Sequence, residues 1–148
     1  MDIPRAFLHL LLMKIMFASV LLVSFLYACS SGDSYKKAED AQDAGREFIR
    51  ASLDGNMKKA SFYLLRDSVN DYFFNKWRDQ YNKLSPEEKK LYQDAQIRPI
   101  QIENVNDSTV NYVFTNSYKQ NDTTQIKVIR QAGEWLVDLK EIGSNQRK

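Results

Sequence analysis

The pattern of apolar residues changes near Ile97, and this change limits the folds open to the chain. Between residues 38 and 95, apolar side chains recur three and four positions apart with charged residues between them, as in amphipathic helices. After residue 97, β-branched and aromatic residues dominate and are interrupted by short polar breaks, as in strands joined by hairpins. The order predicts an α+β fold, in which N-terminal helices pack on one face of a four-stranded, antiparallel, curved sheet.

Four helices are predicted from capping and breaking residues. The first begins after Ser34 and ends at Gly55, because glycine tolerates the left-handed conformation that ends many helices. Asn56 caps a short second helix that runs to about residue 65. Ser68 caps the third, and the fourth follows Ser85 and a proline and runs to about residue 95. The strands are predicted at 98–105, 109–118, 123–131 and 135–142.

The N-terminus carries an apolar stretch from Ile15 to Ala28 that follows a basic residue, Lys14. A longer apolar run would span a bilayer as a helix, whereas a stretch of this length is typical of a secretory signal peptide. Lys14 interrupts the run and favours the signal peptide, over residues 1–28. Met13 is a natural start for such a peptide, so residues 1–12 are interpreted as an over-extended gene start.

The end of this stretch, Leu26-Tyr27-Ala28-Cys29, resembles the lipobox of bacterial lipoproteins. The resemblance implies cleavage before Cys29 and attachment of lipid to its thiol, which leaves residues 29–37 as a lipidated tether. Tyr27 departs from the small residue usual at that position. Ser30, in place of aspartate, implies sorting to the outer membrane on the side facing the periplasm, and display on the cell surface stays open. The alternative interpretation is a plain signal anchor with an incidental cysteine.

The chain after the tether is similar to the NTF2-like, cystatin-like superfamily of α+β cones, and within it to the lipoprotein-associated DUF4878 type. The similarity rests on the helix end Leu53-Asp54-Gly55-Asn56, the following segment 59–64 and the hairpin 128–138. It covers about residues 37–142, so the domain is placed at 38–142 and followed by a polar tail at 143–148. The fold hosts both enzymes and non-enzymes, so the resemblance implies architecture more than activity.

The chain after the predicted cleavage site lacks much of the usual catalytic equipment. The only histidine of the full sequence, His9, lies in the predicted signal peptide, and the only cysteine is Cys29. Catalysis by Ser-His-Asp or Cys-His sites and zinc or copper binding through nitrogen and sulfur are therefore excluded, and no metal or cofactor is predicted. The residues after 28 carry 19 Lys and Arg against 18 Asp and Glu, so no nucleic-acid partner is expected.

An enzyme that uses a buried carboxylate as general base remains open. The candidate carboxylates are Asp138, Glu103 and Asp67, with Tyr112 or Tyr63 as the partner. Asp138 alternates with apolar residues of its strand, which places it on the opposite face of the sheet and favours a solvated or salt-bridged side chain.

Five aromatic residues are candidates for lining a concavity between the third helix and the sheet. They are Phe73, Trp77, Tyr112, Phe114 and Trp135. Ligand pockets are mostly apolar with a few polar groups, but aromatics at helical and strand spacing more often belong to the core. Both interpretations remain open.

A short pattern, aspartate followed by serine or threonine and an apolar residue or threonine, occurs around Ser68, Ser108 and Thr123. It resembles the O-glycosylation sequon of some anaerobic Gram-negative bacteria. Two of the three sites fall at predicted hairpin turns, where a glycan has room.

The sequence thus favours a membrane-tethered, non-enzymatic domain that binds a small ligand or an envelope protein. A carboxylate-based isomerase or dehydratase is the second hypothesis, and an immunity or inhibitor-like lipoprotein is the third. The resemblance also implies a homodimer through the exposed sheet face as one arrangement.

Overall fold

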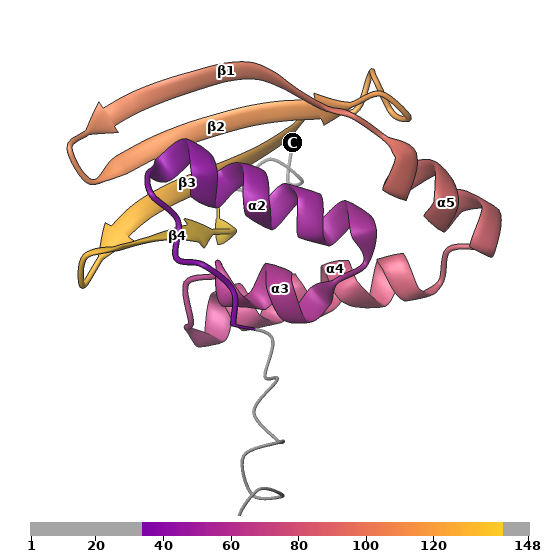
Figure 1. Ribbon diagram of the computed structural model, residues 1–148, viewed down its shortest axis with the longest axis horizontal. Helices are drawn as coiled ribbons and strands as arrows, with labels where there is room; N and C mark the ends of the chain where they lie inside the picture. Colours follow the sequence, from indigo (N-terminus) through magenta and orange to yellow (C-terminus); the bar gives the residue numbers. More distant parts are fainter. Residues whose placement is uncertain (1–33, 141–148) are drawn as a thin grey trace, which may run out of the picture. The chain divides into compact units, whose positions relative to one another are not determined.

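The computed structural model of the protein describes residues 34–140; the predicted signal peptide, Cys29 and the tail 143–148 lie outside this range. Within it, four helices precede four strands, and the predicted α+β class is confirmed (Figure 1). No helix in this range combines the length and apolar character needed to cross a bilayer. In chain order the elements are α2 (Ala41–Asp54), α3 (Met57–Phe62), α4 (Ser68–Asn82), α5 (Pro86–Asp94), β1 (Ile97–Asn106), β2 (Thr109–Asn116), β3 (Thr124–Gln131) and β4 (Glu134–Asp138).

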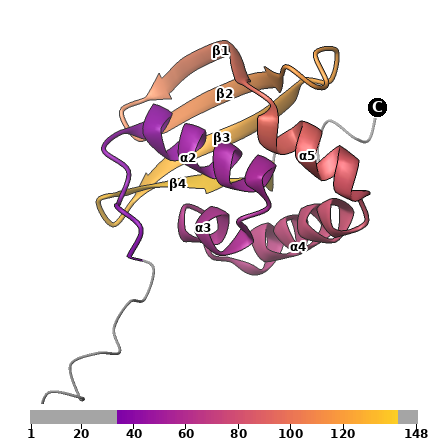
Figure 2. The same ribbon diagram turned by 45° about the vertical axis from the view of Figure 1, so that its right-hand side comes forward.

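Helix α2 is the central helix of the domain and lies against the inner face of the sheet (Figure 2). It begins after Asp40, whose carboxylate accepts a hydrogen bond from the Asp43 backbone N–H at 2.7 Å. The prediction that Ser34 caps this helix is wrong, because Asp40 fills that role six residues later. The helix ends at Gly55 as predicted, with φ at 74°.

Side-chain caps also fix the ends of the other helices. Asn56 caps α3 as predicted, and Ser85 with Glu88 forms a capping box at the start of α5. The prediction for α4 is wrong by one residue. Asp67 is its cap and accepts hydrogen bonds from two backbone N–H groups of the first turn, whereas Ser68 is the first helical residue.

The sheet is antiparallel with strand order β1-β2-β3-β4, so each strand pairs with its neighbours in sequence. Tyr112 stands opposite Ile102 of β1 and Ile126 of β3, which places these residues on one face. Two irregularities interrupt the β1–β2 register, and bulges of this kind increase local twist. Strand β2 ends at Asn116, two residues before the predicted end, because the Asn116 side chain accepts hydrogen bonds from two backbone N–H groups of the next turn.

The two edges of the sheet differ. Strand β4 is covered by the segment between α3 and α4: Val137 donates a backbone hydrogen bond to Tyr63 at 2.7 Å and accepts one from Leu65 at 2.9 Å. Strand β1 forms the other edge, and most of its residues are exposed. Bulges and Pro99 interrupt this open edge, which disfavours pairing with another chain.

Candidate functional site

A cavity of about 370 Å³ opens between the C-terminal halves of α2 and α4, helix α5 and the hairpin that joins β2 to β3. Its apolar wall is formed by Leu53 of α2, Trp77 of α4 and Phe114 of β2. Leu53 and Phe114 are buried, and Trp77 is half-buried against the core. The volume lies at the lower end of the range for small-molecule sites.

Large aromatic side chains explain why space remains here. Phe48 of α2 meets the ring of Trp77 edge-on, with 5.7 Å between centroids, and packs at 6.3 Å from Phe74. These rings act as spacers between α2 and α4. At the other end of α2, Gly45 allows the sheet to come close, since a Cβ on it would lie 3.3 Å from the Tyr112 ring.

The rim of the cavity is polar and aromatic. Three tyrosine rings form a row. The centroid of Tyr92 lies 6.5 Å from that of Tyr81 and 5.0 Å from that of Tyr118, and Tyr81 and Tyr92 line the cavity. The ammonium group of Lys119 lies 5.7 Å from the Tyr92 ring centroid, and the Tyr92 side chain raises the pKa of Lys119. Asn116 lines the same rim and also holds the hairpin turn in place.

Helix α5 is held over the cavity by a side chain of α2. Arg50 donates to the backbone carbonyls of Ala95 at 2.7 Å, Gln93 at 3.1 Å and Tyr92 at 3.3 Å, and it pairs with Asp54 at 2.8 Å. It therefore satisfies the Gln93 and Ala95 carbonyls at the end of α5 and shares the Tyr92 carbonyl with the Ala95 backbone N–H. The position of Tyr92 follows from this cap.

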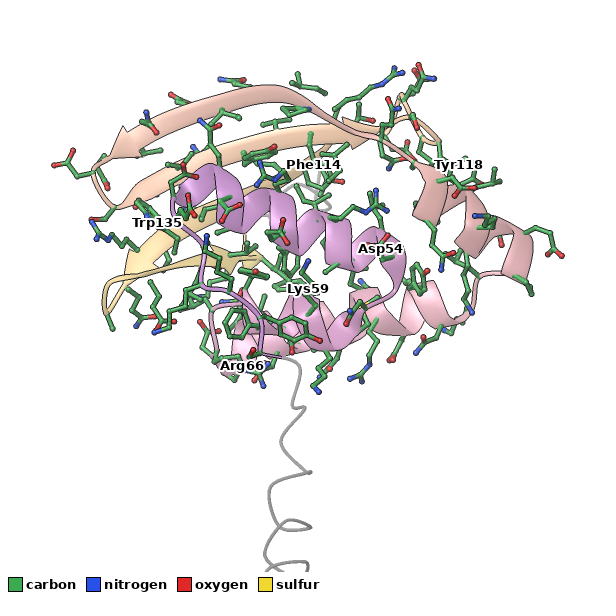
Figure 3. All side chains as sticks on the ribbon, in the orientation of Figure 1. Asp54, Lys59, Arg66, Phe114, Tyr118 and Trp135 are labelled. Atoms are coloured by element: carbon green, nitrogen blue, oxygen red, sulfur yellow. The ribbon has the colours of Figure 1, made fainter. Side chains whose placement is uncertain are left out.

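Two of the five predicted aromatics, Trp77 and Phe114, meet at this cavity. The five do not line one concavity, and all of them belong to the hydrophobic core or pack against it, which agrees with the core interpretation. Tyr112 lines a more open depression beside β1, and Trp135 lines another near the β1–β2 turn. Trp135 lies at the opposite end of the sheet from Tyr118, as Figure 3 shows. Phe73 packs against the core.

None of the three candidate carboxylates lines the cavity. Asp67 caps α4, and hydrogen bonds from the Asn70 backbone and Lys140 lower its pKa to about 2. Asp138 accepts a hydrogen bond from the Lys140 backbone, and Glu103 is exposed on β1. A carboxylate that acts as a general base needs a pKa raised to near the working pH, whereas the pKa of Asp67 is lowered.

The two candidate tyrosines are also apart from the cavity. Tyr63 is buried and donates to the Lys36 carbonyl at 2.8 Å, and burial raises its pKa. Burial likewise raises the pKa of Tyr112. No tyrosine–carboxylate pair of the predicted kind is assembled among these five residues.

The three possible glycosylation residues are all exposed. Ser108 lies in the β1–β2 turn and Thr123 directly precedes β3, while Ser68 begins α4. Their modification stays a prediction.

The chain matches no known protein-family model and no curated protein. Among solved structures it is similar to an NTF-2 like protein of unknown function from Shewanella oneidensis MR-1, with 11% sequence identity and a TM-score of 0.46. The alignment covers 65% of this chain and 89% of that chain. A function is therefore inferred from this chain's own residues.

Proposed function

We propose that the protein is a lipid-anchored envelope protein whose NTF2-like domain, of the DUF4878 type, binds a small amphipathic molecule in the cavity beside Trp77. The observation that carries this proposal is the cavity itself, which combines an apolar wall with a polar rim. Such a combination is typical of small-molecule sites, where a few polar groups fix the orientation of an apolar ligand.

The residues of the cavity suggest how the ligand is held. Leu53, Trp77 and Phe114 form a surface for a compact apolar body. Lys119 stands at the rim and offers its ammonium group to an anionic end of the ligand, while the Asp122 carboxylate on the same rim confines that end to the side of Lys119. A small carboxylate or sulfonate with an aromatic or aliphatic body therefore fits this site.

An environment-sensitive dye tests the cavity. Anilinonaphthalene sulfonate has an apolar ring system and one anionic group, so we expect saturable binding at one site with a rise in fluorescence. Gln80→Trp places a large side chain at the exposed rim and should abolish the signal. Asn75→Trp, at an exposed position of the same helix outside the cavity, is the matched control. Equal binding by both variants would refute the site.

A second pair of variants tests the charge preference. Lys119→Ala should weaken binding of the anionic dye about tenfold, because a charge-assisted contact contributes roughly 1.5 kcal/mol or more. Lys90→Ala, on the exposed side of α5 and paired with Asp94, should leave binding unchanged. If Lys119→Ala binds as tightly as the original chain, the ligand's polar end lies elsewhere.

The lipid anchor is proposed from the sequence Leu26-Tyr27-Ala28-Cys29, which lies outside the described residues. Multiple acyl chains on one cysteine would anchor the protein stably, whereas a single chain binds membranes only marginally. We expect the native protein to fractionate with membranes, in the outer membrane facing the periplasm. Cys29→Ala should lose both the lipid mass and the membrane association; unchanged fractionation of Cys29→Ala would refute the anchor.

A further inference from the structure

We propose that the domain rests on the lipid surface through an anchor-side face, formed by Tyr35, Phe62, Arg66, Val69 and Tyr72. This inference rests on the lipid anchor proposed above and adds to it the side of the domain that faces the bilayer. It starts from the place where the chain leaves the domain.

The first described residues are fixed to α3. The Tyr35 ring packs on Phe62 with 5.6 Å between centroids, and Phe62 meets Tyr63 edge-on at 5.1 Å. The Tyr63 hydroxyl donates to the Lys36 carbonyl at 2.8 Å, and Lys37 forms an ion pair with Glu134. The packed domain therefore begins at Tyr35, three residues before the predicted boundary.

The short distance along the chain limits how far this point is from the membrane. Tyr35 lies six positions after Cys29 in the chain, and a fully extended segment of that length spans roughly 20 Å. If Cys29 carries the lipid, α3 must stay within about that distance of the headgroups. The side of the domain that carries α3 therefore faces the bilayer.

The exposed side chains on this side suit a lipid surface. Phe62 is 39% exposed, Val69 45% and Tyr72 62%, although large apolar or aromatic side chains are usually covered. Val69 and Tyr72 are three residues apart on α4 and so are neighbours on its surface. Tyrosine is favoured at membrane–water interfaces, where its ring is buried and its hydroxyl remains hydrated.

Basic side chains lie beside these apolar residues. Lys36, Lys37 and Arg66 each expose more than 60% of their side chains. Each is paired with a carboxylate, Lys36 with Glu39, Lys37 with Glu134 and Arg66 with Asp71. Exposed ion pairs of this kind contribute little to stability, so these cations remain accessible to anionic lipid headgroups. The combination favours a bilayer over a second protein as the occupant of this face.

The proposed contact leaves the ligand cavity accessible. Helices α3 and α4 form the layer of the domain opposite β1 (Figure 1). Val69 and Tyr72 belong to the first turns of α4, whereas Trp77, Gln80 and Tyr81 reach the cavity from its later turns.

Quenching of a fluorescent label by the bilayer tests the contact. The full chain, produced with its own signal and purified with its lipid, is reconstituted in vesicles of phosphatidylethanolamine and phosphatidylglycerol that carry nitroxide on their acyl chains. A thiol-reactive nitrobenzoxadiazole label is placed at Tyr72→Cys or, as the matched control, at Ile100→Cys on β1. Both positions are more than half exposed.

We expect the nitroxide lipids to quench the label at position 72 at least twofold more than the label at position 100. Equal quenching, or stronger quenching at position 100, in protein that floats with the vesicles would overturn the anchor-side face and leave the anchor intact. Protein that does not float would overturn the lipid anchor and this inference with it.

Discussion

The described domain has a closed part and an open part, and the two are built from different side chains. The closed part lies between α2 and the strands β3 and β4, where Ile126, Val128, Val137 and Leu139 are fully buried. The open part lies between the C-terminal halves of α2 and α4, α5 and the β2–β3 hairpin. No residue of α5 is buried, and the cavity of about 370 Å³ remains.

Side-chain size explains the difference. On the closed side, Gly45 and Ala44 of α2 allow the sheet to approach until aliphatic side chains fill the space. On the open side, Trp77 and Tyr81 line a space that no side chain fills. Stability is thus concentrated in the closed part, and the open part is available for binding.

The largest expected effect comes from the closed part. Ile126→Ala removes a fully buried side chain and should lower the free energy of unfolding by about 2 to 5 kcal/mol. Leu91→Ala, at a position 48% exposed on α5, should change it by no more than about 0.5 kcal/mol. Urea denaturation measures both. Similar losses in the two variants would remove the distinction between the two parts.

The next largest effect concerns a buried polar link. Asn70 is fully buried, and its side-chain oxygen accepts a hydrogen bond from the Leu139 backbone N–H at 2.7 Å. Asn70→Ala leaves that donor unpaired and should cost about 1 to 3 kcal/mol. The exposed Asn75 of the same helix is the matched control, and Asn75→Ala should be nearly neutral in the same denaturation assay. A neutral Asn70→Ala would show that this link does not hold α4 to the sheet.

Removing a tyrosine hydroxyl from each part should change the free energy of unfolding in opposite directions. Tyr63 in the closed part donates to the Lys36 carbonyl, whereas the Tyr81 hydroxyl beside the cavity is buried with no hydrogen-bond partner among residues 34–140. Tyr63→Phe should lower the free energy of unfolding by about 1 kcal/mol, and Tyr81→Phe should raise it by about 1 kcal/mol. Loss of stability in Tyr81→Phe would mean that its hydroxyl is paired in solution.

The smallest effect depends on pH. Hydrogen bonds from the Asn70 backbone and from Lys140 lower the pKa of Asp67 from 3.8 to about 2. A depressed pKa stabilises the folded state above pH 4, and this stabilisation is lost as the pH falls from about 4 to 2. Asp67→Asn keeps a capping side chain but loses the charge. Its urea midpoint should lie below that of the original chain at pH 7 and approach it near pH 2; a constant difference would contradict the pKa.

Local signals made the fold predictable from the sequence. Gly55 and the Ser85–Glu88 capping box mark helix ends through neighbouring residues alone, and the change of period at Ile97 divides helices from strands. For α2 and α4 the sequence predicts serine caps where the structure has aspartates, because both residue types are common at helix N-termini. At α4 the carboxylate of Asp67 takes it from the adjacent Ser68.

The site was less predictable because it depends on how distant elements meet. Trp77 and Phe114 were expected at a shared concavity, but Tyr92 and Lys119 reach it from α5 and the hairpin. Their approach depends on Arg50, which binds carbonyls more than 40 residues away in the chain. A single sequence carries no signal for a contact of that range. The alternation of apolar and polar residues along a strand also does not distinguish Trp135 from Phe114, although the two lie in different parts of the sheet.

Mass spectrometry of the native protein under non-denaturing conditions tests the cavity most directly. The chain is purified from its own membranes and compared with Gln80→Trp and Asn75→Trp. We expect the original chain and Asn75→Trp to carry a small molecule in addition to the lipid mass on Cys29, and Gln80→Trp to carry the lipid mass alone. The same bound mass on all three chains, or no bound molecule on any of them, would contradict a ligand site in the open part of the domain.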